Sequence, residues 1–321
     1  MSTDNEERKR ISIVVPVYNE REVVDIFYHR LKNVLDSLQS FVYEIIFVDD
    51  GSKDGTYQKL IDLAISDKNI NVIKLSRNFG HQIAITAGID FARGDAVVVI
   101  DADLQDPPEI IKDFVIKWQE GYDVVYGVRE NRLGETGMKL FTANLFYRIL
   151  KRLTHVDIPI DVGDFRLMSK RVVKQFRKFR EQDRFVRGLV SWVGYSQIGI
   201  PYSREKRYAG ETKYPYTQML KFAIDGLTSF SSVPLRLATY LGYITSFFAF
   251  LYACSVFIQK ALGITVQGWA TIMVGMLFIG GVQLICLGII GEYISRIFTE
   301  TKQRPMYLVE EIFNSESYNN E

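Results

Sequence analysis

The N-terminal part of the chain alternates between short apolar runs and segments with helical periodicity. Helical patterns cover Glu22–Leu38 and Ile83–Ala92, and a further helix is expected between the second and third apolar runs. Alternation at this spacing predicts an α/β fold, a Rossmann-like, mostly parallel sheet with helices on both faces. The runs that predict buried strands are rich in β-branched residues: Ile11–Val15, Glu44–Val48, Val72–Leu75 and Ala96–Ile100.

The pattern changes beyond Leu133. Before that point, Asp123–Tyr126 is typical of a strand. Beyond it, Phe141–Leu153 is typical of an amphipathic helix, and Asp161–Arg166 is typical of a loop that enters a strand. Tyr214–Arg236 mixes aromatic, aliphatic and basic residues, which favours a helix lying in a membrane interface.

Two long apolar runs follow, roughly Leu237–Ile258 and Ala270–Ile294. Each supplies the ~20 residues that are needed to cross ~30 Å of hydrocarbon. The alternative, a pair of buried helices in a soluble core, is disfavoured because two consecutive runs of this length carry almost no charge. The sequence therefore predicts a transmembrane hairpin.

Basic residues are distributed unevenly around these two runs. The loop between them offers only Lys260, whereas both outer flanks are basic, so the positive-inside rule places both ends of the hairpin in the cytoplasm. Met1–Arg10 has no apolar core and is not a signal peptide. The basic flanking residues are Arg204, Lys206, Arg207, Lys213, Lys221 and Arg236 before the first run, and Arg296, Lys302 and Arg304 after the second.

These patterns divide the chain into four parts. We expect a cytosolic catalytic domain over 1–213, a juxtamembrane segment over 214–236, the two spans within 237–297 and a cytosolic tail over 298–321. The end of that tail, Pro305–Glu321, is polar, and we expect it to be poorly ordered and assign it no role.

Composition narrows the classes of function. The 39 Lys and Arg nearly balance 38 Asp and Glu, and a net charge of +1 disfavours a nucleic-acid binder. Cys254 and Cys286 lie in apolar runs and are expected to be reduced packing residues.

Polar residues gather where the predicted strands end. Pro16–Glu20, Asp49–Asp50 and Asp101–Gln105 each follow a strand, and parallel α/β sheets bind ligands beyond the carboxyl ends of their strands. Asp101 and Asp103 supply two carboxylates and Gln105 a neutral oxygen, the ligands that a hard divalent cation prefers. An Asp-x-Asp pair alone is a weak signal; directly after a buried strand it predicts a metal site.

Three motifs together resemble a known family. Val15–Glu20 (VPVYNE), Val48–Thr56 (VDDGSKDGT) and Asp101–Pro108 (DADLQDPP) are similar to the motifs of family 2 glycosyltransferases with the GT-A fold. With the hairpin, the chain resembles polyisoprenyl-phosphate glycosyltransferases, including dolichol-phosphate mannose synthases and bacterial undecaprenyl-phosphate glucosyltransferases. The resemblance implies a plasma-membrane enzyme that transfers a hexose to a polyisoprenyl phosphate, and the expected hexose is glucose from UDP-glucose. It also implies inversion at the anomeric carbon and a requirement for Mg²⁺ or Mn²⁺.

The resemblance also implies roles on the donor side. Pro16, Tyr18 and Glu20 would border the nucleotide, and Val48 and Asp50 would hold its base and ribose. Asp101, Ala102 and Asp103 would meet the diphosphate and sugar, and Asp101, Asp103 and Gln105 would hold the metal. Arg129 would pair with phosphate. A purely structural alternative, an Asx turn, suits Asp54 better than Asp50.

On the acceptor side, Asp164 matches the family's proposed catalytic carboxylate. Because a lipid phosphate is already anionic, a general base is less needed, and Asp164 could instead orient the acceptor or contact the sugar. A further alternative is an internal ion pair with Arg166, and Asp161 and Asp157 are weaker candidates for the same role.

Arg207 and Lys213 flank a segment that resembles the family's mobile acceptor loop, where both would touch phosphate. The same basic run could also attract anionic headgroups. His81 follows a strand and could approach the donor, although an ordinary loop histidine is the simpler interpretation.

Alternatives remain open for substrate and assembly. The same fold could use GDP-mannose or UDP-N-acetylglucosamine, or could be a non-catalytic nucleotide-binding membrane subunit. Small residues at Gly275, Gly280, Gly281 and Gly288 suit close helix packing, either within the hairpin or between protomers of a homo-oligomer.

Overall fold

The computed structural model describes residues 8–129, 162–205, 233–263 and 268–314. They belong to two compact units, a sheet domain that includes the segment from Pro305 onward and a helical hairpin. The predicted helix over Phe141–Leu153, most of the predicted interfacial segment Tyr214–Arg236, and Asp157 and Asp161 lie outside these residues.

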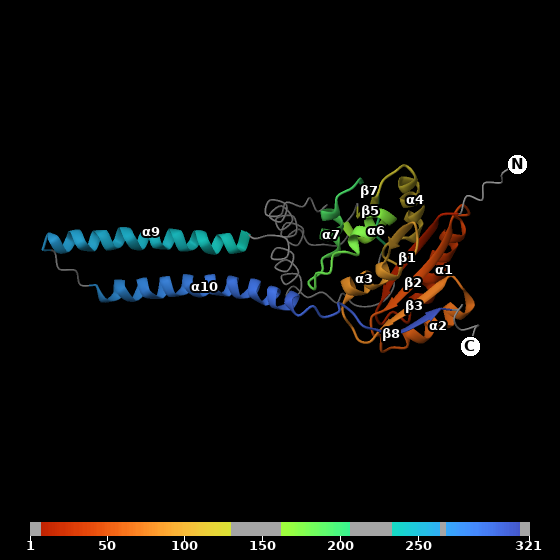
Figure 1. Cartoon of the computed structure of the whole chain (residues 1–321), viewed down its shortest axis with the longest axis horizontal. Coiled ribbons are helices and arrows are strands. Elements are labelled where there is room, and N and C mark those ends of the chain that lie inside the picture. The colour runs from red at the N-terminus through yellow and green to blue at the C-terminus, as the bar shows by residue number, and fades with distance from the viewer. Residues whose placement is uncertain (1–7, 130–161, 206–232, 264–267, 315–321) are drawn as a thin grey trace. The chain divides into compact units, whose positions relative to one another are not determined.

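The sheet domain begins with the predicted alternation of strands and helices (Figure 1). The described residues form an eight-stranded sheet in the order β7-β5-β6-β4-β1-β2-β3-β8, in which β3, β2, β1 and β4 are mutually parallel. The elements of this part are β1 (Arg10–Val17), α1 (Val24–Asp36), β2 (Val42–Asp49), α2 (Thr56–Ser66), β3 (Ile70–Leu75), α3 (His81–Phe91) and β4 (Ala96–Val99).

The second half of the sheet departs from simple alternation. β6 lies between β4 and β5 and runs antiparallel to both, while β5 and β7 pair in parallel. The elements of this part are η1 (Pro108–Ile110), α4 (Ile111–Gln119), β5 (Val124–Arg129), β6 (Val162–Ser169), α6 (Lys170–Phe176), α7 (Val186–Val193) and β7 (Gln197–Tyr202). The expectation of a loop over Asp161–Arg166 was wrong from Val162 onward, because β6 already begins there.

Helices cover both faces of the sheet. One core cluster joins alternate residues of β1, such as Ile11 and Ile13, to buried residues of α1, α2 and α4. The intervening β1 residue Val14 faces the other side, where α3 lies so close that a Cβ on Gly88 would come 2.2 Å from Val14 Cγ1. Glycine at this point therefore lets a helix approach the sheet more closely than any side chain would allow.

The C-terminal tail contains an unexpected strand. β8 (Val309–Asn314) pairs antiparallel with β3, and Lys74 forms an ion pair of 2.9 Å with Glu310 across that edge. Tyr307 Oη donates a hydrogen bond of 2.9 Å to Asp90. The expectation of a poorly ordered tail was wrong for this stretch, because a short run of mixed polar and apolar residues is enough for an edge strand with one face exposed.

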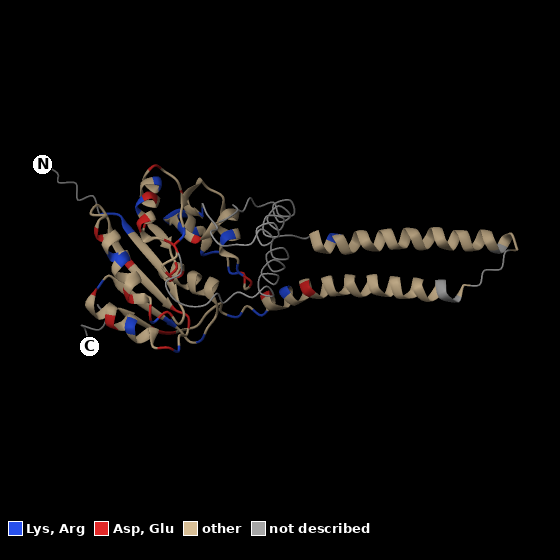
Figure 2. Ribbon diagram, turned by 180° about the vertical axis from the view of Figure 1, so that it is seen from behind, with Lys and Arg blue, Asp and Glu red and all other residues tan. Residues whose placement is uncertain are grey.

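The hairpin consists of α9 (Val233–Ala261) and α10 (Trp269–Thr301). Val233–Gln259 and Ile272–Thr301 are long and apolar enough to span a membrane, with mean hydropathy of 1.8 and 2.3, and neither most apolar stretch is buried within the protein. The alternative of buried core helices is therefore wrong, and the hairpin supports association with a membrane. Figure 2 shows how charged residues are nearly absent from the long middle of both helices.

The glycines of α10 do not serve packing within the hairpin. A Cβ added at Gly275, Gly280, Gly281 or Gly288 would meet no atom within 4 Å, so the described residues give these positions no close helix contact. Their use between protomers stays a prediction.

Substitution Gly88→Ala should destabilise the sheet domain by about 1–3 kcal/mol, the usual cost of overpacking a dense core. The new methyl group would overlap Val14, and this outweighs the roughly 1 kcal/mol that alanine gains over glycine in a helix. Denaturant unfolding of the detergent-solubilised protein measures the effect. Gly275→Ala is the matched control, since it changes helix propensity without a clash, and an unchanged midpoint for Gly88→Ala would contradict the packing argument.

Candidate active site

The predicted donor loops meet at the carboxyl ends of β1, β2 and β4. Tyr18 is exposed beyond the end of β1, and the main-chain N–H of Glu20 donates a hydrogen bond of 3.0 Å to Thr56 Oγ1. Pro16 is buried within β1. Val48 is buried within β2, and its side chain faces α3 near Gly88, so a contact between Val48 and a nucleotide would have to come from the main chain.

Asp50 holds a neighbouring loop. Its two carboxylate oxygens accept hydrogen bonds from the main-chain N–H groups of Phe79, at 2.7 Å, and Gly80, at 2.9 Å. Burial raises the pKa of Asp50, although these two donors act in the opposite direction. The Asx turn is formed by Asp54, whose Oδ1 accepts from the N–H of Thr56 at 3.0 Å, and the role of Asp50 toward base and ribose stays a prediction.

The Asp101–Gln105 segment leaves β4 as a tight turn. Asp103 Oδ1 accepts a hydrogen bond of 3.1 Å from the N–H of Gln105, and Leu104 adopts a left-handed conformation with φ of 59°. Ala102 is buried beneath the turn. A left-handed backbone is costly for leucine, and such strain persists only where the surroundings fix the turn.

The donor atoms of this turn fit a divalent cation. Asp101 Oδ1 is buried and makes no hydrogen bond to the described residues, although His81 Nε2 lies 3.5 Å away. Burial raises the pKa of Asp101 to about 6. Within the described part of the chain no three His, Cys, Asp or Glu residues form a complete metal cluster. This suits a cation such as Mg²⁺, which takes one or two carboxylates and completes its shell with substrate phosphate and water.

Asp164 faces Asp101 across the sheet. The β4–β6 register pairs Val99, the last residue of β4, with Arg166. Asp101 lies two residues beyond that end and Asp164 two residues before Arg166, and both carboxylates lie within 3.5 Å of His81 Nε2. Asp164 is only 3% exposed and accepts hydrogen bonds from Arg187 Nε at 3.0 Å, Arg187 Nη2 at 3.1 Å and Gln82 Nε2 at 3.2 Å.

The alternative of an internal ion pair between Asp164 and Arg166 was wrong. Arg166 donates to the main-chain oxygens of Gly163 and Asp164, and the carboxylate is bound by Arg187. Burial alone would raise the pKa of Asp164, but the charge of Arg187 and the contact with His81 hold it well below its ordinary value. A carboxylate held ionised in this way is a weak base at neutral pH.

The part that His81 plays in the site was underestimated from the sequence. It is the first residue of α3 rather than an ordinary loop residue, and its Nε2 lies 3.5 Å from Asp101 Oδ1 and 3.4 Å from Asp164 Oδ2. Although burial opposes the imidazolium, the two carboxylates raise its pKa to about 9. Gln82 and Arg187 were also missed; the signal was only that His81-Gln82 opens a helix after the short connection that follows β3.

A buried carboxylate, Asp106, lies just beyond the turn and is surrounded by Tyr202, Arg129 and Arg204. It is 1% exposed and accepts a hydrogen bond of 2.5 Å from Tyr202 Oη, while Arg129 Nη2 and Arg204 Nε lie 3.9 Å and 3.5 Å away. A Cβ on Gly163 would come 2.6 Å from Arg129 Nη2, so that glycine leaves room for the guanidinium. Arg129 thus extends from the end of β5 toward the same sheet edge as the Asp101–Gln105 turn.

The chain that leads toward the predicted acceptor loop is tied to the same turn. The N–H of Glu205 donates a hydrogen bond of 3.0 Å to the main-chain oxygen of Gln105, and the Glu205 carboxylate pairs with Arg30 at 2.6 Å. Arg207 and Lys213 themselves lie outside the described residues.

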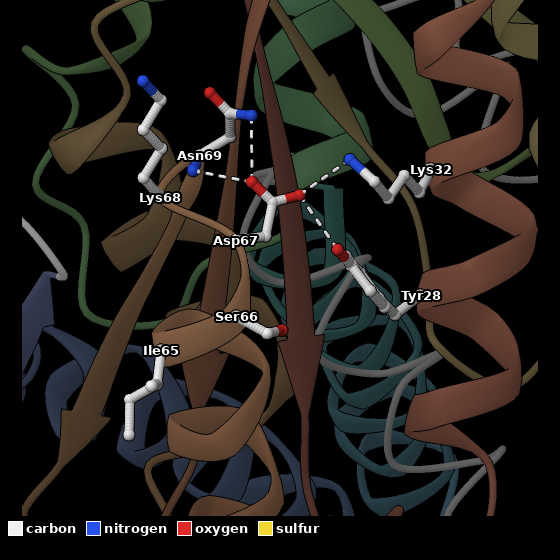
Figure 3. A pocket seen from close by; sticks show the side chains of 7 residues that line it. All are labelled: Tyr28, Lys32, Ile65, Ser66, Asp67, Lys68 and Asn69. Carbon is white, nitrogen blue, oxygen red and sulfur yellow. Dashed lines mark hydrogen bonds and ion pairs between the residues drawn. The ribbon is translucent and has the colours of Figure 1, made fainter.

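A pocket elsewhere on the surface, of about 440 Å³, is lined by α1, the end of α2 and the turn before β3 (Figure 3). At its centre Asp67 accepts hydrogen bonds of 2.9 Å from Tyr28 Oη, Lys32 Nζ and Asn69 Nδ2. Because these partners join α1 to the turn after α2, we interpret the cluster as a structural tie.

Comparisons with known proteins show which family the chain belongs to. Residues 12–177 match "Glycosyl transferase family 2", and residues 233–297 match "GtrB C-terminal hairpin". The chain belongs to glycosyl transferase family 2. It is a glycosyltransferase with a GT-A sheet domain followed by a hairpin of two apolar helices.

Several relatives are similar to this chain over nearly its whole length. The chain is 51% identical to the uncharacterized glycosyltransferase YkcC of Bacillus subtilis (strain 168), over 95% of each chain. It is 42% identical to the bactoprenol glucosyl transferase of Shigella phage SfX, over 94% of this chain and 98% of that one. It is 40% identical to a prophage bactoprenol glucosyl transferase homolog of Escherichia coli (strain K12), over 94% and 99%.

Substitution Tyr202→Phe should lower the free energy of unfolding by about 1–3 kcal/mol, because it removes a hydrogen-bond donor from the buried carboxylate of Asp106. Chemical denaturation measures the loss. Tyr122→Phe is the matched control, since Tyr122 packs against the core and its hydroxyl makes no hydrogen bond within the described chain. Equal effects of the two substitutions would contradict the role assigned to Tyr202.

Proposed function

We propose that this glycosyltransferase transfers glucose from UDP-glucose to the phosphate of a polyisoprenyl lipid, undecaprenyl phosphate, at the cytoplasmic face of the plasma membrane. The observation that carries the proposal is the likeness to bactoprenol glucosyl transferases over nearly the whole chain, hairpin included. The paired carboxylates at the end of β4 add a site suited to a donor that bears a diphosphate.

The reaction is an in-line displacement. An oxygen of the lipid phosphate attacks the anomeric carbon, the bond from that carbon to the diphosphate oxygen breaks, and UDP leaves with the bonding electrons. The configuration at the anomeric carbon is inverted, and no covalent sugar–enzyme intermediate forms. Since the attacking phosphate is already anionic, no residue has to remove a proton from it.

The state of Asp164 supports this acceptor. A hydroxyl acceptor would favour a general base with a pKa near neutrality, whereas the pKa of Asp164 is held far below that range beside Arg187. An acceptor that is already charged removes the need for such a base, so the site is better suited to a phosphate than to an alcohol.

Asp101, Asp103 and Gln105 would hold Mg²⁺ or Mn²⁺ together with the diphosphate. Such a cation neutralises charge that develops on a departing phosphate. Around it the residues of the chain have their own tasks: Arg129, anchored beside Asp106, pairs with phosphate, and Pro16, Tyr18, Glu20, Val48 and Asp50 border the nucleotide.

On the lipid side, Arg207 and Lys213 bind the acceptor phosphate while the prenyl chain stays in the bilayer. The basic flanks of the hairpin, with Lys260 near the end of α9 as the single basic residue between its two apolar runs, orient both termini and the sheet domain toward the cytoplasm. Anchoring confines the enzyme and its lipid to the same surface, which raises the effective concentration of the acceptor.

A donor screen tests the proposed reaction. Full-length protein in detergent with undecaprenyl phosphate should release UDP from UDP-glucose faster than it cleaves GDP-mannose or UDP-N-acetylglucosamine, and EDTA should abolish turnover. Asp103→Asn should lower kcat on the order of 100-fold, comparable to the loss of one charge-stabilising group. Faster turnover of another donor would show that the transferred sugar is not glucose. No turnover with any donor would favour a non-catalytic subunit.

The acceptor loop has a separate signature. Arg207→Ala and Lys213→Ala should each raise the KM for undecaprenyl phosphate about 10- to 100-fold, because each loses a charged hydrogen bond worth about 1.5–3 kcal/mol. The Kd for UDP, measured by calorimetry, should stay unchanged. Lys178→Ala, at an exposed basic position in the sheet domain, is the control, and an equal effect there would indicate non-specific attraction to anionic lipid.

A further inference from the structure

A continuous series of contacts links Arg187 to the predicted metal ligand Asp101. Arg187 binds Asp164 through two nitrogens at 3.0 Å and 3.1 Å. Asp164 Oδ2 lies 3.4 Å from His81 Nε2, and the same nitrogen lies 3.5 Å from Asp101 Oδ1. Both oxygens belong to carboxylates, so His81 Nε2 lies within ion-pair distance of two acceptors at once.

We propose that His81 is a positioning residue for the metal site, holding the Asp101 carboxylate in place from the fixed point that Asp164 and Arg187 provide. The inference rests on the proposed function in one respect, namely that a divalent cation binds at Asp101. It assigns Asp164 to the support of that site rather than to proton removal.

The Asp164 carboxylate, which we call the anchor, is held by residues of three elements. Gln82, on α3, donates to Asp164 at 3.2 Å through Nε2 and accepts from the main-chain N–H of Val186 at 2.9 Å through Oε1. Arg187 belongs to α7 and Asp164 to β6. The carboxylate therefore joins α3, β6 and α7, and its 3% exposure leaves it little room to move.

His81 is the link between this anchor and the open part of the site. Its side chain is 39% exposed, against 3% for Asp164 and 25% for Asp101. Asp101 Oδ1 has no hydrogen bond within the described chain, and the ion-pair contact recorded for it there is with His81 Nε2, at 3.5 Å. Carboxylates that bind metals are commonly oriented by such outer partners, and loss of one typically costs 10- to 100-fold in metal affinity or activity, an order-of-magnitude range.

A different role for His81 predicts the opposite sign. If the imidazole were merely a positive group near Asp101, it would compete with the cation, and its removal would tighten metal binding. If it positions Asp101, its removal weakens metal binding even though a positive charge is lost.

The experiment titrates Mn²⁺ into full-length detergent-solubilised protein with UDP present and no acceptor, and follows free Mn²⁺ by electron paramagnetic resonance. His81→Ala should raise the Kd for Mn²⁺ about 10- to 100-fold. His81→Gln, which keeps an N–H donor without a charge, should restore most of the affinity. His29→Ala, an exposed histidine on α1, is the matched control and should leave the Kd unchanged.

Arg187 tests the direction of support. Arg187→Gln should weaken Mn²⁺ binding as well, and the double variant with His81→Ala should lose little more than His81→Ala alone, because both act through one series of contacts. Thermal unfolding identifies any variant that fails to fold. If His81→Ala does not fold, the Kd of His81→Gln for Mn²⁺ is compared with that of the wild-type protein instead. Unchanged or tighter Mn²⁺ binding in folded His81→Ala would overturn the proposal, as would full additivity of the two substitutions.

These outcomes are separate from those of the proposed function. Mn²⁺ binding is measured without sugar or lipid, so a wrong donor or acceptor would leave the result intact. If the wild-type protein bound no Mn²⁺ in the presence of UDP, the metal site itself would be refuted, and the positioning role with it.

Discussion

The site depends on the antiparallel pairing of β6 with β4. That pairing brings Asp164, near the start of one strand, opposite Asp101, just past the end of the other. A buried carboxylate beside a second, partly buried one is unfavourable unless cations compensate them. Arg187 and His81 supply that compensation, and their positions in turn fix how α7 and α3 approach the sheet. The arrangement of three elements thus follows from the need to neutralise one pair of acidic groups.

Charge compensation also suits the chemistry of the proposed reaction. A nucleotide diphosphate and a lipid phosphate are both anions, and both must enter a region that already contains Asp101, Asp103, Asp106 and Asp164. Basic groups on several elements offset this excess: Arg187 beside Asp164, Arg129 and Arg204 near Asp106. Because each of these guanidinium groups lies near a buried carboxylate, it is oriented before any substrate arrives, which lowers the cost of ordering on binding.

The sequence predicted the parts of the molecule that depend on local pattern. Buried parallel strands such as β1 and β4, the metal-type turn after β4 and the two apolar spans each leave a signature within a few consecutive residues. The Asp101–Gln105 turn could be found because strand, turn and ligand types are adjacent. Its geometry is as expected, while the ligands it binds remain predictions.

The parts that were missed depend on register or on distant partners. Nothing near Asp164 in the sequence indicates Arg187, because the pair forms only when α7 docks beside β6. Arg166, two residues away, was the partner that the sequence offered as an alternative, but its guanidinium donates to a main-chain oxygen instead. β8 was missed because an edge strand with one face exposed carries few apolar residues, and its partner β3 lies far earlier in the chain.

The position of β8 has a consequence for biosynthesis. A ribosome completes β3 long before it makes α9 and α10, and only afterwards does it make the strand that pairs with β3. Until then the edge of β3 presents unpaired main-chain groups, the kind of surface that invites association with other chains. The last strand of the sheet can therefore be added only after both hairpin helices have been synthesised, so completion of the catalytic domain follows synthesis of the hairpin.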